Sequence, residues 1–213
     1  MSGRLAIAVL VSGAGTNLQA LLDSVHEHEV EIVAVASSVA DAPALARASS
    51  RGVQTRVFER VQYPDRLARD RALADWLSEH GVGLVVLAGY MELLSGEFLA
   101  RFPHAVINVH PSLLPAFPGL RAIEQALAYG VKVFGVTVHF VDDGTDTGPV
   151  ILQRALELPG VSDPEEVRRE LRPLEHALLI EAVRLFAGRA LNVDPGNPRR
   201  VLVGSPPHRA GEG

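Results

Sequence analysis

The feature that most limits the possible folds is a regular alternation of short apolar runs with longer segments of helical period in the first half of the chain. The runs are rich in β-branched residues, which indicates strands. The expected strands are 5–11, 30–36, 53–58, 83–88 and 105–109, and the expected helices are 17–27, 42–51, 64–80 and 95–101. Such βαβ units build a parallel sheet with helices on its faces. The run 84–88 lacks alternation, which predicts a central strand buried on both sides.

Several residues suit the ends of these helices. Asn17 and Ser95 are suitable helix starts, and Gly52 and Gly81 are suitable stops.

The second half of the chain has a different pattern, which begins with a proline-rich loop after His110. Further expected elements are a helix near 121–129, strands at 132–141 and 149–157 joined by an acidic turn at 142–148, and a last helix at about 163–188. Asp163 followed by Pro164 is a typical helix start. Pro173 lies inside this last helix and is expected to kink it or divide it in two.

Length and composition fit one enzyme-sized domain, since 213 residues that are 47 % hydrophobic can bury a full core. We expect an α/β fold with a doubly wound, mostly parallel sheet, a Rossmann-like N-terminal half and an antiparallel strand in the C-terminal half. The domain is predicted to cover residues 1–190, followed by an extension at 191–213. From about residue 204 the extension holds two prolines, three glycines and no apolar period, so we expect disorder there.

Charge and cysteine content exclude several classes of protein. The chain has no cysteine, which rules out disulfides and thiolate metal sites. Its net charge is −5, its 20 Lys and Arg are scattered and only 5 % of residues are aromatic, so nucleic acid is not an expected partner. The run 5–11 superficially resembles a signal peptide, but we interpret it as a strand because it leads directly into a glycine turn and a helix. No stretch approaches the roughly 18 apolar residues of a membrane span, and we expect a soluble, cytoplasmic protein with no membrane partner.

The first segment with chemical character is Ser-Gly-Ala-Gly-Thr-Asn at 12–17, between the first expected strand and helix. Backbone N–H groups and the positive helix end bind phosphate at such a turn. A dinucleotide fingerprint would need a third glycine where this sequence has Leu18, and an acidic residue at the end of the second strand, where it has Ser37 and Ser38. The turn therefore favours a monophosphate over NAD. A tight turn without a ligand explains these glycines equally well.

The second segment places Asn108 and His110 at the carboxyl end of the fifth expected strand, where ligands collect in open α/β sheets. Side chains two apart in a strand share a face, so the amide and the imidazole would converge. The alternative is a histidine bonded to a local carbonyl, beside prolines that only shape a loop.

The third segment is 135–141 with the acidic turn after it. Asp142 and Asp143 could simply face solvent or cap backbone amides, as carboxylates in glycine-bearing turns usually do. A metal site is not expected, since the eight histidines show no His-x-x-x-His or comparable spacing.

Read in order, these segments resemble the glycinamide ribonucleotide formyltransferase family, in its small monofunctional bacterial form, over about residues 5–190. The motifs are S-G-x-G-T-N-L-Q-A from Ser12, V-V-L-A-G-Y-M from Val85, N-V-H-P-S-L-L-P-A-F-P-G from Asn108, the stretch 135–151, and Glu175-His176. The resemblance implies transfer of a formyl group from 10-formyltetrahydrofolate to the amine of glycinamide ribonucleotide in purine synthesis. It also implies that both partners are small molecules, with residues 1–109 binding the nucleotide and 110–190 the folate.

The resemblance implies roles for individual residues. The catalytic residues would be Asn108, His110 and Asp146. The ribonucleotide would contact Gly15, Thr16, Asn17 and Glu175. The folate would contact Arg66, Met91, Glu92, Leu93, Leu94, Asn108, Asp142, Asp143, Gly144, Thr145 and Asp146. Three positions depart from the family's usual residues. Glu92 stands where a basic residue is common, Thr145 stands where an apolar residue is usual, and Arg172-Pro173 occupies a stretch that often supplies a Gln.

In the mechanism that this implies, the amine attacks the formyl carbon, and Asn108 and His110 stabilise the oxyanion. Asp146 would favour the imidazolium form of His110, and a water would relay a proton to the leaving nitrogen.

Other functions fit the sequence less well. A methionyl-tRNA formyltransferase would need a further C-terminal domain and a basic face, and a formyltetrahydrofolate hydrolase an additional N-terminal domain; we expect neither. A sugar-nucleotide formyltransferase and a non-catalytic nucleotide-binding module stay open. We expect a monomer or weak homodimer.

Overall fold

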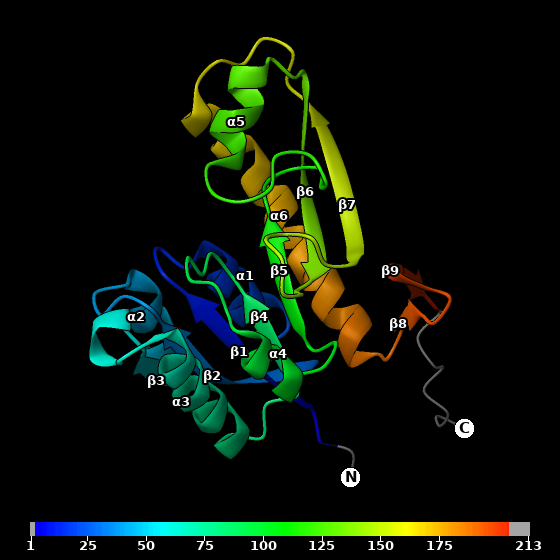
Figure 1. The fold of residues 1–213 in the computed structure, drawn as a ribbon. Helices are drawn as coiled ribbons and strands as arrows, with labels where there is room; N and C mark the ends of the chain where they lie inside the picture. Colours follow the sequence, from blue (N-terminus) through cyan, green and yellow to red (C-terminus); the bar gives the residue numbers. More distant parts are fainter. Residues whose placement is uncertain (1–2, 205–213) are drawn as a thin grey trace.

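The computed structural model describes residues 3–204, which form one sheet with helices on both faces (Figure 1). The strands are β1 (Leu5–Val11), β2 (Val30–Ser37), β3 (Gln54–Val57), β4 (Leu84–Leu87), β5 (Val106–His110), β6 (Val133–Phe140), β7 (Val150–Glu157), β8 (Leu191–Asp194) and β9 (Asn197–Val203). The helices are α1 (Thr16–Ser24), α2 (Pro43–Ser49), α3 (Arg66–Glu79), α4 (Gly96–Arg101), α5 (Ala122–Tyr129) and α6 (Pro164–Ala187), with a short 3-10 turn η1 (Arg60–Gln62). The elements predicted up to residue 188 are therefore present, with small shifts at their ends.

The sheet has the order β3-β2-β1-β4-β5-β6-β7-β9-β8. Strands β1 to β5 pair in parallel, whereas β6 runs antiparallel to both β5 and β7. This confirms the predicted fold class. The chain order reverses between β1 and β4, and the loops that follow their carboxyl ends diverge there, which leaves room for a ligand.

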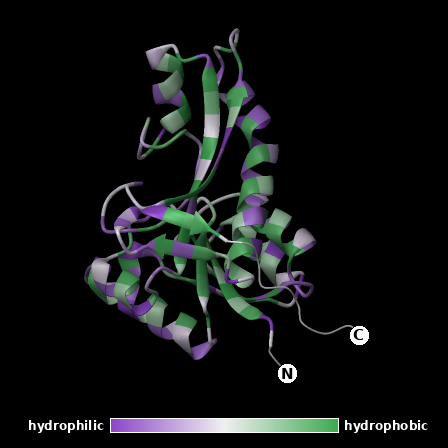
Figure 2. Cartoon of the chain, turned by 90° about the vertical axis from the view of Figure 1, so that its right-hand side faces the viewer, coloured by the Kyte–Doolittle hydropathy of each residue, from purple (hydrophilic) through white to green (hydrophobic). Residues whose placement is uncertain are grey.

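Two apolar clusters hold helices to the two faces of the sheet. One joins α1, α2, α5 and α6 to one face, and the other joins α3 and α4 to the opposite face. Figure 2 shows hydrophobic residues along the central strands and mixed colouring along the helices, as expected for helices with one buried side. All of β4 is buried, as its uninterrupted apolar run predicts.

The helix ends correct one prediction and confirm another. Ser95 caps α4, because its side chain accepts a hydrogen bond from the Phe98 N–H. Asn17 does not begin α1: Gly15 is the cap, with a left-handed φ of 72° that favours glycine. Asn17 lies inside the first turn with its side chain directed across to α6, so its polar group serves a tertiary contact instead of a cap.

The last helix begins as predicted, with Asp163 Oδ1 accepting from the Glu165 N–H and Pro164 in the first turn. It then runs as one helix past Pro173, so of the two predicted outcomes the division into two helices is wrong, and the kink stays a prediction. Leu171 and Leu178, on either side of the proline, are buried in the same cluster. Their shared burial offsets the hydrogen bond that proline removes.

The extension after residue 190 forms a hairpin that was not predicted. Strands β8 and β9 pair antiparallel, and β9 joins β7 in parallel at Val150 and Arg200. Part of the signal was present in the sequence, where a short alternating run at 191–194 precedes Pro195 and Gly196 and an apolar run follows at 201–203. The disorder predicted beyond residue 204 lies outside the described residues. Within residues 3–204, no helix has both the length and the apolar character needed to cross a bilayer.

Candidate active site

A cavity of about 1030 Å³ opens at the carboxyl ends of the parallel strands. Its walls come from the segments after β1, β4 and β5, the start of α5, the acidic turn between β6 and β7, and one side of α6. Single-ligand pockets usually measure about 300–1,000 Å³. This cavity lies at the upper end of that range and is large enough for a small-molecule ligand.

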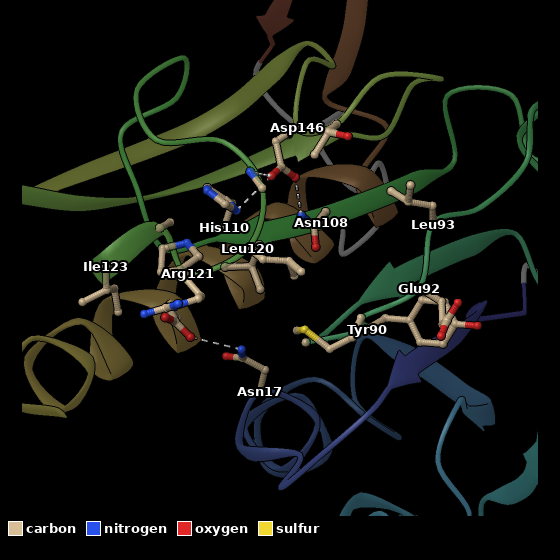
Figure 3. A pocket seen from close by; sticks show the side chains of 18 of the residues that line it. Asn17, Tyr90, Glu92, Leu93, Asn108, His110, Leu120, Arg121, Ile123 and Asp146 are labelled. Atoms are coloured by element: carbon tan, nitrogen blue, oxygen red, sulfur yellow. Dashed lines mark hydrogen bonds and ion pairs between the residues drawn. The ribbon is translucent and has the colours of Figure 1, made fainter. Parts of the chain in front are cut away.

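Asp146 stands at the centre of the polar groups in this cavity (Figure 3). Its Oδ2 lies 3.2 Å from His110 Nδ1 and accepts a hydrogen bond of 2.7 Å from the Gly119 N–H. Its Oδ1 accepts from Asn108 Nδ2 across 3.3 Å. The predicted convergence of Asn108 and His110 is thus observed, and the point on which they converge is a carboxylate 36 or more residues away along the chain.

The charge of Asp146 is stabilised by these neighbours. Burial by itself would raise the pKa of this carboxyl, but the His139 ring 3.5 Å away, the hydrogen bond from the Gly119 N–H and the nearby His110 outweigh it. The pKa of Asp146 is consequently below its ordinary value. The residue also has a positive φ of 54°, a backbone strain that is common at functional sites.

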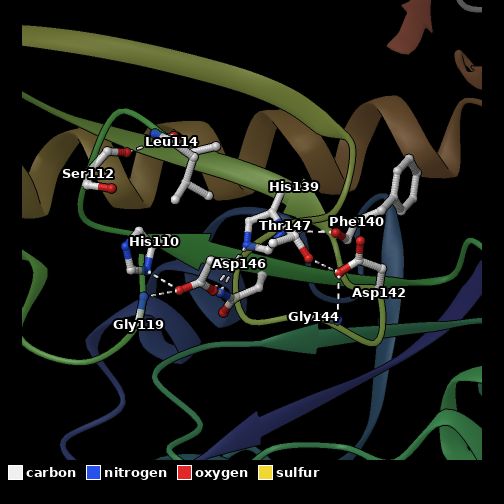
Figure 4. A network of polar contacts seen from close by, with 12 residues as sticks. His110, Ser112, Leu114, Gly119, His139, Phe140, Asp142, Gly144, Asp146 and Thr147 are labelled. Atoms are coloured by element: carbon white, nitrogen blue, oxygen red, sulfur yellow. Dashed lines mark hydrogen bonds and ion pairs between the residues drawn. The ribbon is translucent and has the colours of Figure 1, made fainter. Parts of the chain in front are cut away.

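His110 is held between two acceptors, as Figure 4 shows for Asp146. Its Nε2 lies 2.9 Å from the Phe117 carbonyl oxygen, while its Nδ1 faces the Asp146 carboxylate. A carbonyl and a carboxylate can only accept, so a proton on each ring nitrogen satisfies both contacts. This arrangement makes Nε2 the nitrogen that a substrate could reach by replacing the Phe117 carbonyl.

The loop after β5 is anchored by Thr137 on the neighbouring strand. Thr137 Oγ1 donates to the Ser112 carbonyl at 2.7 Å and accepts from the Leu114 N–H at 3.1 Å. Gln153 Nε2 adds a bond of 2.8 Å to the Leu114 carbonyl. These contacts explain why Thr137 is buried although it is polar, and they fix the first half of the loop that carries Phe117 and Gly119.

The turn after β1 reaches the cavity, although Gly15 itself does not line it. Thr16 and Asn17 line the wall, and Gly15 stands at the helix cap behind them. A Cβ on Gly15 would lie 2.5 Å from the Ala44 Cβ, so both the left-handed φ and the close approach of α2 require glycine. The first N–H groups of α1 have no partner within the helix and can therefore bind an anion.

Glu175 faces this turn from α6. Asn17 Nδ2 donates to Glu175 Oε2 across 3.3 Å. Burial raises the pKa of the Glu175 carboxyl, although the Asn17 hydrogen bond and the positive charges of Arg172 and Arg168 oppose the effect.

The segment after β4 forms the other end of the cavity. Met91, Glu92 and Leu93 line it together with Arg66 at the start of α3, whereas Leu94 packs into the core beneath. Met91 and Leu93 are 62 % and 57 % exposed, which leaves apolar surface free for a flat ring.

A buried ion-pair network supports this segment from below. The side chain of Arg69 is fully buried and donates to Asp70, to Glu92 Oε2 at 2.6 Å and to the Leu93 carbonyl at 2.9 Å. Asp70 also accepts from the Ser95 N–H at 2.7 Å. Burial raises the pKa of the neighbouring Tyr90 hydroxyl to about 12, so it stays protonated.

The acidic turn contributes unequally to the cavity. Thr145 and Asp146 line the wall, while Asp142, Asp143 and Gly144 stand outside the lining. Asp142 Oδ1 accepts from the Gly144 N–H at 3.1 Å and from Thr147 Oγ1 at 2.6 Å (Figure 4). Asp142 therefore caps its own turn, as predicted for a carboxylate in a glycine-bearing turn that has no ligand-binding role.

Several residues of the cavity were given no role from the sequence. Six arginines line it in a chain of net charge −5: Arg60, Arg66, Arg69, Arg121, Arg168 and Arg172. Only Arg66 matched a family position, and spacing alone could not find the others because they come from four separate segments. His139 also reaches the site, with Nε2 3.5 Å from Asp146 Oδ1.

One group of potential metal ligands occurs among the described residues, namely His26, Glu27 and Glu31. It lies between α1 and the start of β2, at the opposite edge of the sheet from the cavity. It has no part in the site described above.

Comparison with known proteins identifies the family. The sequence model of the formyl transferase family matches residues 5–183. The phosphoribosylglycinamide formyltransferase of Bacillus subtilis is 38 % identical over 184 residues, which are 85 % of this chain and 94 % of that protein. The chain belongs to the phosphoribosylglycinamide formyltransferase family.

The chain also matches part of a larger protein. The trifunctional purine biosynthetic protein adenosine-3 of Bos taurus is 40 % identical over 189 residues, and the chain spans about a fifth of its length. The crystal structure of glycinamide ribonucleotide transformylase 1 from Symbiobacterium toebii superposes with a TM-score of 0.92 at 46 % identity, covering 96 % of both chains. These relatives confirm the family resemblance drawn from the five motifs.

Proposed function

We propose that this protein is a phosphoribosylglycinamide formyltransferase, which moves the formyl group of 10-formyltetrahydrofolate to the amine of glycinamide ribonucleotide in purine synthesis. The observation that carries the proposal is the meeting of Asn108, His110 and Asp146 within 3.3 Å contacts, in a cavity that the glycine-bearing turn after β1 also enters. The names of its relatives support the same activity.

Charge and shape support a place for each substrate. The ribonucleotide phosphate would bind the N–H groups of Gly15, Thr16 and Asn17 at the start of α1, with Glu175 beside the ribose or the amine. The folate ring would lie against the exposed apolar segment at Met91 to Leu93, with Thr145 opposite and Arg66 near the mouth. Leu94, Asp142, Asp143 and Gly144 would act by shaping these walls.

The proposed reaction forms one carbon–nitrogen bond and breaks another. The amine attacks the formyl carbon, and the negative charge that develops on the formyl oxygen is stabilised by Asn108 Nδ2 and His110 Nε2. A single donor of this kind typically contributes about 2.7–4 kcal/mol to lowering the barrier. A proton then leaves the new ammonium through a water held by Asp146 and reaches the folate nitrogen, which departs as tetrahydrofolate.

A turnover assay tests the proposal directly. Purified protein is given both substrates, and formation of tetrahydrofolate and of the formylated ribonucleotide is measured. Transfer at a rate typical of enzymes would support the proposal, whereas release of formate at the same rate without the ribonucleotide would indicate a hydrolase. Thermal stabilisation by the ligands with no transfer would indicate a binding module.

The expected assembly is a separate proposal. A monomer or weak homodimer, located in the cytoplasm, stays a prediction that sedimentation and cell fractionation would test.

A further inference from the structure

On the basis of the proposed function, we infer that His139 is a positioning residue for formyl transfer: through Nε2 it holds the Asp146 carboxylate and the Asn108 carboxamide in their working orientations. His139 lies on β6 directly opposite Asn108 on β5 in the antiparallel pair. Cross-strand neighbours of this kind have Cβ atoms about 4.5–5.5 Å apart. The pairing of the two strands therefore brings the imidazole to the carboxamide independently of any ligand.

The protonation of one ring nitrogen follows from its partner. His139 Nδ1 lies 2.8 Å from the Phe140 carbonyl oxygen. A carbonyl only accepts hydrogen bonds, so Nδ1 carries a hydrogen. The other nitrogen, Nε2, is left to face the site, where Asn108 Nδ2 is 3.2 Å away and Asp146 Oδ1 is 3.5 Å away.

Both charge states of His139 support the same arrangement. In the neutral ring, Nε2 accepts one N–H of Asn108, while the other N–H of that amide goes to Asp146 Oδ1. In the protonated ring, Nε2 donates to Asp146 Oδ1 and leaves one Asn108 N–H for a formyl oxygen. The titratable groups in contact with Asp146 are His110 from β5 and His139 from β6.

His139 also excludes the wrong orientation of the Asn108 amide. The amide oxygen and nitrogen have similar size, so packing alone does not distinguish the two orientations. With the acceptors Asp146 and neutral His139 on one side, the NH₂ group must face them, and Figure 3 shows the Asn108 oxygen pointing away from Asp146. An oxyanion is a stronger acceptor than a neutral imidazole, so it can take over the N–H that His139 holds in the free protein.

A purely structural role makes a different prediction. The His139 side chain is 2 % exposed, and a residue that only fills the core can be replaced by another of similar size and polarity. The two amides distinguish the roles, because Gln places its amide near the Nε2 position that faces Asp146, whereas Asn reaches only the Nδ1 position that faces Phe140.

We therefore compare His139→Gln with His139→Asn by measuring turnover, both Michaelis constants and the pH profile. His139→Asn is expected to lower turnover about tenfold or more with both Michaelis constants little changed, since a small displacement of catalytic groups has effects of this order. Its acid limb should move to higher pH, because Asp146 loses the nearby ring that most strongly lowers its pKa. His139→Gln should keep most of the turnover and the wild-type acid limb.

Val136→Ala is the matched control. Val136 lies three residues earlier on the same strand, is fully buried, and packs in the apolar cluster that α6 covers instead of bonding to Asp146 or to the loop after β5. It should lower the melting temperature without moving the acid limb. Equal turnover and equal acid limbs in the Gln and Asn variants would overturn the positioning role.

Turnover of the wild-type protein tests the proposed function, whereas the pH dependence of unfolding tests the His139 contact separately. If the wild-type protein transfers no formyl group, the proposed function is wrong. The pH dependence of unfolding still reports the ionisation of Asp146 without substrate, and it should be weaker in His139→Asn than in His139→Gln. The same dependence in both variants would contradict the contact itself.

Discussion

Asn17 Nδ2 donates a hydrogen bond to Glu175 Oε2 across 3.3 Å, which joins the first turn of α1 to the middle of α6, 158 residues later in the chain. The contact places a carboxylate beside the helix end that is proposed to bind a phosphate. Burial disfavours the charged form of Glu175 and so lowers the stability of the folded state when the carboxyl is ionised. Natural proteins commonly keep such destabilising groups at functional sites.

Glu175→Gln should make the protein more stable at high pH. Because burial raises the folded-state pKa of Glu175, the folded state favours the protonated carboxyl, and stability is lost as pH rises from the unfolded pKa through the folded one. Gln stays neutral and can still accept from Asn17. The melting temperature of the variant should exceed that of the wild type at pH 8 and match it near pH 4, rising by about 2–4 °C for each kcal/mol of relieved desolvation. Equal melting curves at pH 8 would show that Glu175 ionises there without cost.

Gly15→Ala should reduce both stability and apparent affinity for the ribonucleotide. The left-handed φ of 72° costs a residue with a Cβ about 1–2 kcal/mol, and the added Cβ would lie 2.5 Å from the Ala44 Cβ. The turn must then shift, so its N–H groups would no longer point toward the proposed phosphate position. Measurements of melting temperature and of the Michaelis constant for the ribonucleotide test this.

Gly13→Ala is the matched control for stability in the same turn. A Cβ there has no described atom within 4 Å, and its φ is not left-handed. It should leave the melting temperature unchanged. If Gly15→Ala melts at the wild-type temperature too, the strain assigned to this position is absent.

Asp146→Asn should separate chemistry from binding. The amide keeps the shape of the side chain and can still accept from the Gly119 N–H, but it removes the charge that His110 and His139 face. Turnover should fall by about 10²–10⁴-fold, the usual contribution of proton transfer by a positioned group. Calorimetry should find folate binding nearly intact. Turnover close to that of the wild type would refute the role proposed for Asp146.

Arg69→Met should destabilise the protein strongly. It leaves the buried Asp70 without its cation and removes the bonds to Glu92 and the Leu93 carbonyl. Breaking a buried pair in this way typically costs about 3–5 kcal/mol, measured by chemical denaturation. The Michaelis constant for the folate should also rise, because the segment after β4 loses its support.

Arg71→Met on the same helix is the comparison. Arg71 pairs with Glu97 on the surface, where both side chains are at least half exposed, so its loss should change stability little. A comparable loss of stability in the two variants would mean that burial does not account for the importance of Arg69.

The sequence by itself determined the order and type of the elements up to residue 188, because the apolar period and the glycines that end helices are local signals. It also pointed to the motifs that identify the family, including Asn108 and His110, two residues apart on one strand. Contacts among residues far apart in the chain have no such period. Only the tertiary structure decided that Asn17 serves Glu175 instead of capping α1, that α6 continues through Pro173, and that His139 faces Asp146. The physical reason is that burial and the pairing of β5 with β6 override the local preferences of these residues, and both depend on how the whole chain packs.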